Sequence, residues 1–349
     1  MLQSAVFQNF TTVPNGEWQF AAGLNVIVGE NGLGKSHVLK ALYAMLKVQS
    51  GWTERPSKAD LERTYAEKLV RVMRPETLGR LVKRKQGRER CELRLVMQVE
   101  AQNSAIAFAT NAKSQVDVIG TPAEGLELPP VYFPTRELIT LCPWFLGLYD
   151  NYHLEFEETW RDTVSLLGAP SVRGPREQRA AQLLAPLEAA LGGKVVMDTQ
   201  TGRFYLKVPG EGQMEMPLVA EGLRKFAMLA RLISTGSLLD KGYLFWDEPE
   251  TNLNPKLIKT IAASIVRLAA QGIQVFVATH SLFLLREFEI QLHAHANKRK
   301  AIGARFFGLH VGESGSVYLE QADDLAAIGS ITALEESLRQ SDRYLTLGE

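Results

Sequence analysis

The sequence of 349 residues has few cysteines, no net charge and no long apolar run. Its two cysteines, Cys91 and Cys142, lie in unrelated contexts without metal-ligand spacing, which argues against a disulfide framework and favours a reducing compartment. Lysine and arginine number 39, as do aspartate and glutamate, so no global field attracts nucleic acid or a membrane. No stretch approaches the length of a membrane span, and the N-terminus lacks a signal-peptide pattern. We expect a cytoplasmic protein without a membrane partner.

Internal repeats, low-complexity tracts and sustained heptads are also missing, which argues against a solenoid and a long coiled coil. His293 and His295 have no acid or cysteine cluster nearby, so we do not interpret them as metal ligands. The hydrophobic content of 46% is enough for a sizeable core. These features predict a globular protein of one large domain or two.

A glycine-rich stretch, GENGLGKSH, directly follows the apolar run LNVIV and precedes a helical pattern. It fits the phosphate-binding pattern G-x-x-x-x-G-K-[ST], in which backbone N–H groups surround the phosphates. Lys35 would reach the β- and γ-phosphates, and the Ser36 hydroxyl would bind Mg²⁺. A helix starting near Ser36 points its free N–H groups at the same place. The predicted nucleotide-binding residues are Gly29, Glu30, Asn31, Gly32, Leu33, Gly34, Lys35, Ser36 and His37.

Two further stretches place polar residues at the ends of apolar runs. In YLFWDEPETNLNP, residues 243–255, the run ends at Asp247 and Glu248. Asp247 would serve the Mg²⁺ shell, and Glu248 would polarise the attacking water. In IQVFVATHSLFLLRE, a third apolar run precedes His280, which would touch the γ-phosphate or the water because ligands of open α/β sheets bind at this edge.

Secondary-structure patterns predict an α/β nucleotide-binding sheet. Strand patterns occur at LQSAVFQNF, EWQF, CELRLVMQVEA, SAIAFAT, VYFP, ARFFGLHV and SVYLEQA, and KVVMDTQTGRFYLKV resembles two strands around a turn. Residues 51–99 include a charged helical pattern in which Ser57 and Asp60 are start signals. From 136 to about 204 we expect a helical lobe.

The order GENGLGKS, EGLRKF, YLFWDEPETNLNP and ATHS resembles that of the ABC-type ATPases. The opening FQNF and GLNVIVGENGLGKS is similar to the branch of RecF, SMC, Rad50 and the OLD-type ATPases. The resemblance implies a P-loop NTPase in residues 1–325, with an ABC-type sheet core, an antiparallel β subdomain and a helical lobe, followed by a helical tail at 326–349. It also implies ATP and Mg²⁺ as cofactors.

On this resemblance, two chains sandwich two ATP molecules, and the signature of one chain completes the site of the other. Glu248 is then the general base, His280 the switch histidine and Lys35 a catalytic phosphate ligand. The signature residues acting in trans are Ala220, Glu221 and Gly222, and the D-loop residues are Asn252, Leu253 and Asn254.

Two departures from the family pattern affect the expected activity. The signature usually carries a serine where this chain has Ala220. A lost transition-state donor costs about 3 kcal/mol, so we expect slow hydrolysis. In addition, Thr135, Arg136 and Glu137 follow the VYFP strand where the family has its Q-loop, and no glutamine stands there. We assign a coupling role to this segment.

The partner of the ATPase is predicted by analogy. The chain has no heptads for the coiled coils of SMC and Rad50, and the roughly 25 residues after the last strand pair are too few for the nuclease domain of OLD proteins. It resembles the compact stand-alone OLD-like AAA-family ATPases of bacterial anti-phage defence, which work with a separately encoded nuclease or toxin. A RecF-like repair factor, a nucleotide-sensing scaffold and a transporter energiser are the alternatives.

Local sequence features leave two further questions open. Nine basic and three acidic residues lie between Arg71 and Arg94, and this excess of six positive charges suits either DNA or RNA contacts or a solvated helix face. HANKRK, at 295–300, is a smaller basic loop with the same alternatives. Trp144, Phe145, Leu148 and Tyr149 either fill the core of the lobe or form a partner surface.

Overall fold

The apolar runs that precede the phosphate loop, the acidic pair and His280 become neighbouring parallel strands of one sheet. The computed structural model describes residues 1–83, 89–152, 154–240, 242–297, 301–313, 315–329 and 332–346. The sheet order is β14-β13-β3-β12-β11-β7, and all neighbours are parallel except β13 and β14. The bounds are β3 (Leu24–Gly29), β7 (Val131–Phe133), β11 (Tyr243–Asp247), β12 (Gln274–Thr279), β13 (Ala304–Val311) and β14 (Val317–Ala322).

Successive side chains along these strands point to opposite faces of the sheet and pack into two separate hydrophobic cores. Phe245 and Phe276 stack at 4.8 Å between ring centroids and face the core shared with α1 (Lys35–Val48) and α2 (Lys58–Met73). Leu244 and Trp246 point the other way, into the core shared with the helical side. Because both faces are covered, the strands read as continuous apolar runs, and their polar residues are confined to the strand ends.

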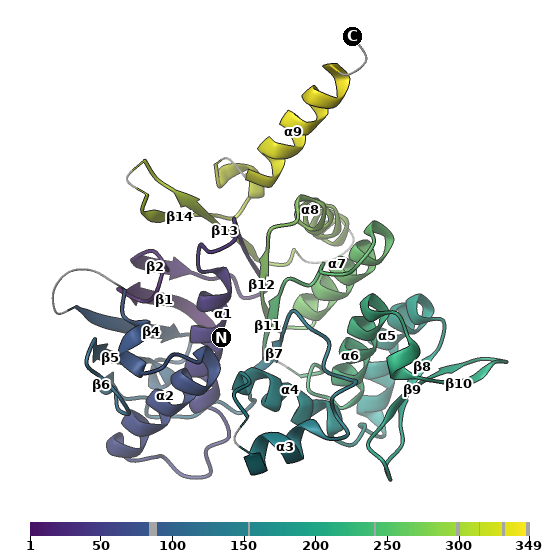
Figure 1. Ribbon diagram of the computed structural model, residues 1–349, viewed down its shortest axis with the longest axis horizontal. Coiled ribbons are helices and arrows are strands. Elements are labelled where there is room, and N and C mark those ends of the chain that lie inside the picture. Colours follow the sequence, from purple (N-terminus) through teal and green to yellow (C-terminus); the bar gives the residue numbers. More distant parts are fainter. Residues whose placement is uncertain are drawn as a thin grey trace.

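An antiparallel sheet packs on the α1 side in the order β2-β1-β4-β5-β6, as predicted for the β subdomain. Figure 1 shows it in purple and blue at the left of the molecule. Ser57 caps α2 by accepting a hydrogen bond from the Asp60 amide, as the sequence predicted. The expected charged insertion at 51–99 holds α2, but its last part is a strand of this sheet. The strands are β1 (Leu2–Gln8), β2 (Gly16–Gln19), β4 (Arg90–Met97), β5 (Ser104–Ala109) and β6 (Asp117–Gly120).

Helices cover the other face of the parallel sheet and extend into the expected helical lobe (Figure 1). The described residues of 136–204 form three helices, and they also include β8 and the first residue of β9, which pair with β10 in a small antiparallel sheet. The elements are α3 (Phe145–Tyr152), α4 (Glu158–Gly168), α5 (Pro175–Leu191), β8 (Lys194–Met197), β9 (Phe204–Val208), β10 (Gly212–Glu215), α6 (Glu221–Ser234), α7 (Pro255–Ala270) and α8 (Leu282–Ala296).

The tail expected at 326–349 contains α9 (Thr332–Leu345), which extends away from the body in Figure 1. Within the described part of the chain, no helix has the length and apolar character needed to cross a bilayer. Some residues of the predicted basic segments lie outside the described residues, and these are Arg84, Lys85, Arg88, Lys298, Arg299 and Lys300.

Candidate nucleotide site

The glycine-rich stretch forms the predicted loop between β3 and α1. A Cβ atom on Gly29 would lie 2.8 Å from the carbonyl oxygen of Leu309, so no larger residue fits there without a shift. Gly34 has φ 97°, and a Cβ atom on it would lie 2.9 Å from Thr12 Oγ1. Glycine is therefore required at both ends of the loop, by close packing and by backbone conformation.

Lys35 lies at the first turn of α1, beside the amides that the helix leaves free for an anion. Its Nζ donates to the carbonyl oxygens of Gly29 and Glu30, each at 2.8 Å. Burial lowers the pKa of Lys35, while the charges of Glu248 and Asp247 act in the opposite direction. The loop thus holds its cation close to the carboxylates that end β11.

Asp247 closes β11 and is only 7% exposed. Burial raises the pKa of its carboxyl, although a hydrogen bond from Ser36 and the charge of Lys40 oppose that shift. Tyr132 Oη donates to Oδ2 at 3.5 Å, whereas Oδ1 is buried and has no hydrogen-bond partner among the described residues. A buried carboxylate oxygen beside a serine hydroxyl is a donor set that Mg²⁺ accepts, so Ser36 and Asp247 fit this ion.

Glu248 and His280 follow adjacent strands and meet at the carboxyl edge of the sheet. Glu248 adopts a left-handed backbone with φ 47°, and its amide donates to the Ala278 carbonyl at 2.9 Å. This backbone turns the side chain towards His280, whose Nδ1 lies 3.2 Å from Glu248 Oε1. Both side chains are partly accessible to solvent.

Glu250 is a further carboxylate at this edge that the sequence reasoning missed. It is 7% exposed, and Thr279 Oγ1 donates to its Oε1 at 2.5 Å. Burial raises the pKa of Glu250, and its Oε2 is without a hydrogen-bond partner in the described chain. In the sequence only its place after the D-E-P tripeptide distinguishes this glutamate, and that place alone does not show that the side chain is buried.

Lys225 on α6 was also missed, because its place in the EGLRKF helix predicts only a buried face. The side chain is fully buried, and Nζ donates to the carbonyl oxygen of Glu248 at 3.3 Å. Burial lowers the pKa of Lys225 to about 8, against the attraction of surrounding carboxylates led by Glu250. The site therefore contains a second buried cation besides Lys35.

The predicted signature and D-loop residues lie against each other within one chain. Ala220 is the exposed N-cap of α6, and Glu221 follows it, also exposed. A Cβ atom on Gly222 would lie 2.5 Å from the carbonyl oxygen of Asn252, which has φ 63°. The start of α6 thus packs on the turn that follows Glu248.

The rest of the D-loop leads into α7. Asn254 accepts a hydrogen bond from the Leu257 amide at 3.0 Å and so caps this helix, while Leu253 packs on the helical core. On the other side, Arg224 Nη1 donates to Glu137 Oε1 at 3.1 Å. The segment given a coupling role in place of the Q-loop is therefore tied directly to α6, the helix that carries the predicted signature residues.

The four residues of the aromatic segment in the lobe, which the sequence assigned either to the core or to a partner surface, do not all have the same role. Phe145 is fully buried in the helical core, and Tyr149 is half-buried against it. Trp144 and Leu148 are 48% and 39% exposed. One face of α3 is core, and the adjacent residues are free to meet a partner.

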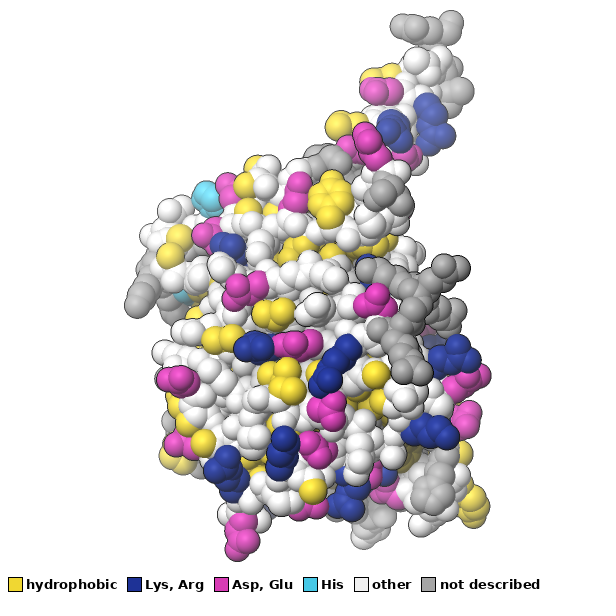
Figure 2. All heavy atoms as spheres, turned by 90° about the vertical axis from the view of Figure 1, so that its left-hand side faces the viewer, with side chains coloured by type: hydrophobic (Ala, Val, Ile, Leu, Met, Phe, Trp, Pro, Cys, Tyr) yellow, Lys and Arg dark blue, Asp and Glu magenta, His cyan; other side chains and the backbone are white. Residues whose placement is uncertain are grey.

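The described arginines of the basic stretch have acidic neighbours. Arg90 pairs with Asp117 at 2.8 Å, and Arg94 pairs with Glu92 at the same distance. Figure 2 shows basic and acidic side chains interspersed over the face that lies at the left in Figure 1. Such mixing is typical of a solvated surface rather than of a stripe that follows a phosphate backbone.

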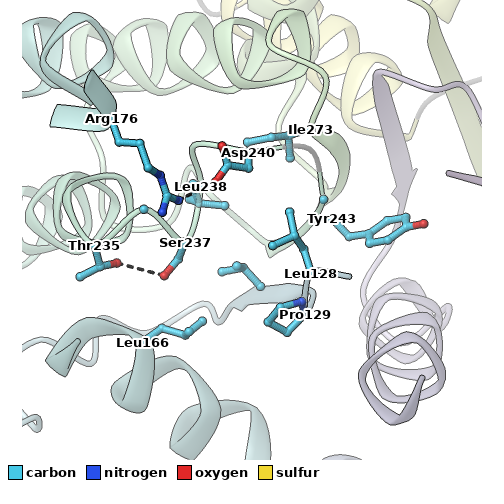
Figure 3. Close-up of a pocket in the computed structure, with 13 residues that line it drawn as sticks. Leu128, Pro129, Leu166, Arg176, Thr235, Ser237, Leu238, Asp240, Tyr243 and Ile273 are labelled. Carbon is cyan, nitrogen blue, oxygen red and sulfur yellow. Dashed lines mark hydrogen bonds and ion pairs between the residues drawn. The ribbon is translucent and has the colours of Figure 1, made fainter. Parts of the chain in front are cut away.

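A cavity of about 180 Å³ lies at the opposite end of β11, beside Tyr243 (Figure 3). Arg176 points towards Asp240 at its rim, and Thr235 Oγ1 and Ser237 Oγ lie 3.0 Å apart. Because β11 runs from Tyr243 to Asp247, this cavity is separated from the phosphate loop by the length of the strand. It is not part of the nucleotide site.

Comparison with known sequences matches residues 131–286 to the family model described as "AAA domain, putative AbiEii toxin, Type IV TA system". The matched segment, which is less than half of the chain, contains Asp247, Glu248 and His280, while residues 29–37 lie outside it. No curated protein matches the sequence significantly.

Comparison with solved structures finds SMC head domains. The SmcHead bound to the C-winged helix domain of ScpA has a TM-score of 0.58 and 13% identity, and the match covers 94% of this chain and 99% of that chain. The second structure is the Smc head domain with an extended coiled coil bound to the C-terminal domain of ScpA, derived from Pyrococcus furiosus. It has a TM-score of 0.54 and 12% identity, and the match covers 98% of this chain and 99% of that chain. The chain therefore has the mixed α/β fold of SMC-head P-loop ATPase domains, as the sequence predicted.

Proposed function

We propose that this protein binds ATP with Mg²⁺ and hydrolyses it slowly, using Glu248 as the general base. The observation that carries the proposal is the convergence of the phosphate loop, the end of β11 and the end of β12 at one edge of the sheet. Lys35 and Asp247 are electrostatically coupled there, and Glu248 lies within hydrogen-bond distance of His280. These are the groups that phosphoryl transfer to water requires.

Binding is assigned to the loop and to the start of α1. The amides of residues 29–36 and the positive end of α1 attract the phosphates, and Lys35 exchanges its two carbonyl acceptors for phosphate oxygens. Ser36 and Asp247 would hold Mg²⁺, which supplies positive charge against the charge that develops during transfer. Asp247 Oδ1 is the buried oxygen that fits this role.

Proton transfer is assigned to Glu248. Its carboxylate takes the proton from the attacking water, and the left-handed backbone at this residue turns it towards the edge where the phosphates bind. His280 Nδ1 bonds to the same carboxylate and fixes its orientation. His280 would thereby hold the general base in position for the attacking water.

We further propose that two chains associate around two ATP molecules. The start of α6, with Ala220, Glu221 and Gly222, presents free helix amides to the triphosphate of the other chain. Since Ala220 supplies no hydroxyl, the trans site lacks one donor and turnover is slow. The same deficit favours a second candidate function, a nucleotide sensor whose ATP-bound dimer persists with little hydrolysis.

The biological role that we propose is control of a separately encoded effector, a nuclease or toxin, in bacterial anti-phage defence. Support comes from the family description, which names a putative AbiEii toxin and a type IV toxin-antitoxin system. The exposed Trp144 and Leu148 offer a surface for such a protein. Co-expression with the product of a neighbouring reading frame, followed by phage plating, tests this role: protection that needs both proteins and Lys35 supports it.

The dimer is tested by sedimentation velocity with and without MgATP. Glu248→Gln should trap a dimer, because the variant binds ATP but removes the base, whereas Lys35→Ala should remain monomeric. The wild type should form the dimer transiently. A Glu248→Gln variant that binds ATP and stays monomeric would refute the sandwich.

A further inference from the structure

We propose that Lys225 is a positioning residue that fixes the backbone of the general base, so that the start of α6 controls the orientation of Glu248. This inference rests on the proposed function and adds to it a route by which one nucleotide site is sensed at the other. Lys225 lies on the signature helix, yet its Nζ donates to the carbonyl oxygen of Glu248 in the turn after β11.

The backbone at Glu248 needs such support. Its φ of 47° is a left-handed conformation that costs a residue with a side chain free energy, and it persists only when neighbouring groups hold it. The Glu248 carbonyl accepts from the Thr251 amide at 3.2 Å and from Thr251 Oγ1 at 3.0 Å. Those donors belong to the same turn, whereas Lys225 reaches it from a different element.

A lysine at this position is costly, which argues for a role beyond packing. The side chain is fully buried, and an apolar residue on the same face of α6 would avoid the desolvation of an ammonium group. Its charge is balanced by the carboxylates facing it, which are Glu221 on its own helix and Asp247, Glu248 and Glu250 after β11. Two further groups lie near these carboxylates, namely Lys35 of the phosphate loop and His280 after β12.

The same helix is also fixed mechanically to the turn. Gly222, one turn before Lys225, packs so closely that a Cβ atom would lie 2.5 Å from the Asn252 carbonyl oxygen. A shift of α6 when its first residues meet the triphosphate of the other chain would therefore be transmitted at two points, Asn252 and Glu248. Lys225 thereby links the contact of α6 with the nucleotide of the other chain to the orientation of Glu248 in its own chain.

The test compares Lys225→Met, which keeps the volume but removes the donor, with Arg231→Met. Arg231 is another buried cation on α6, but its guanidinium donates to the carbonyl oxygens of Leu167 and Ala169, away from the turn. In Lys225→Met we expect kcat to fall about 30-fold, within the range that misplaced catalytic groups cause, while KM changes less than about threefold. Arg231→Met should keep kcat within about threefold of the wild type even if it unfolds earlier.

Two further measurements separate positioning from a general loss of structure. In a Glu248→Gln background, Lys225→Met should cause no further loss, because Lys225 acts through Glu248. In hydrogen exchange, the peptide covering 247–254 should exchange faster in Lys225→Met than in the wild type, because the Thr251 amide donates to the Glu248 carbonyl that Lys225 holds. Its exchange rate should be unchanged in Arg231→Met.

The outcomes distinguish this inference from the proposed function. A wild-type protein without ATP turnover would overturn the function, and hydrogen exchange alone would then decide whether Lys225 holds the turn. If the wild type hydrolyses ATP, then unchanged kcat in Lys225→Met, an equal loss in the Glu248→Gln background, or unaltered exchange at 247–254 would overturn the inference.

Discussion

His280 Nδ1 lies 3.2 Å from Glu248 Oε1, although 32 residues and helix α7 separate the two along the chain. The contact exists because β11 and β12 are parallel neighbours whose carboxyl ends coincide. Parallel pairing thus brings two distant strand ends to one edge of the sheet, which is where we propose that the reaction occurs. The relationship explains why the acidic pair and the histidine each follow an apolar run.

His280→Ala should lower kcat about tenfold to a hundredfold and leave KM nearly unchanged, because the imidazole orients the base and not the bound nucleotide. Steady-state ATP turnover measures both constants. His293→Ala, on the exposed side of α8, is the matched control and should behave as the wild type. Equal effects of the two substitutions would remove His280 from the site.

Ala220→Ser should raise kcat about tenfold or more, since one transition-state donor is worth about 3 kcal/mol. The serine hydroxyl would stand at the N-cap of α6, where it would also stabilise the helix slightly. Turnover of the two proteins at saturating MgATP gives the comparison. If Ala220→Ser stabilised the helix but left kcat unchanged, slow turnover would have another cause.

Glu250→Gln should stabilise the protein by about 1 kcal/mol at pH 7.5, because the burial cost of this carboxylate, with its unpartnered oxygen, exceeds the attraction that it gives to Lys225. Burial raises the pKa of Glu250, so the folded state holds this proton more tightly than the unfolded chain. The contribution of protonated Glu250 to the free energy of unfolding is therefore complete below the pKa that this group has in the unfolded chain. It is lost as the pH rises through the pKa of the group in the folded state. The variant should therefore gain less at pH 5 than at pH 7.5 in urea titrations; an equal gain at both would contradict this origin.

Gly222→Ala should destabilise the protein by about 2 kcal/mol and slow ATP turnover, because the new Cβ would lie 2.5 Å from a backbone oxygen. Gly147→Ala, on α3, provides the control: nothing lies within 4 Å of a Cβ there. Alanine in that helix should be neutral or stabilising by up to about 1 kcal/mol. Thermal unfolding of both variants checks the pair, and similar midpoints would contradict the close packing.

The sequence predicts the parts of this fold that depend on local patterns. The phosphate loop, the strands before Asp247 and His280, and the strand pair β13–β14 all agree with the structure. In the parallel sheet the signal is a continuous apolar run that ends at Gly29, Asp247 or Thr279 and is followed by polar residues. The fold class follows from these strands and their order along the chain.

Residues that act across elements could not be predicted in this way. Tyr43 on α1 donates to Asp162 on α4 at 2.6 Å, and Lys68 on α2 donates to the same carboxylate at 2.6 Å. This buried polar contact holds the lobe against the helix of the phosphate loop. It depends on how α4 returns to the sheet, and neither periodicity nor composition carries that information.

Lys225 and Glu250 illustrate the same limit within the site. A helical pattern shows that position 225 faces the core, but it does not show that the core there consists of carboxylates. Only the packing of α6 on the turn after β11 brings the lysine to the Glu248 carbonyl. Both residues follow from tertiary geometry rather than from a motif.

The central claim is that Lys35, Asp247 and Glu248 form one site for Mg²⁺ and ATP. The most direct test is a calorimetric titration with MgATP, combined with phosphate release, on the wild type, Lys35→Ala and Glu248→Gln. The account predicts saturable binding by the wild type and Glu248→Gln, phosphate release that is faster in the wild type and strongly reduced but still measurable in Glu248→Gln, and no binding by Lys35→Ala. A folded wild-type protein that produces no binding heat and releases no phosphate would contradict it.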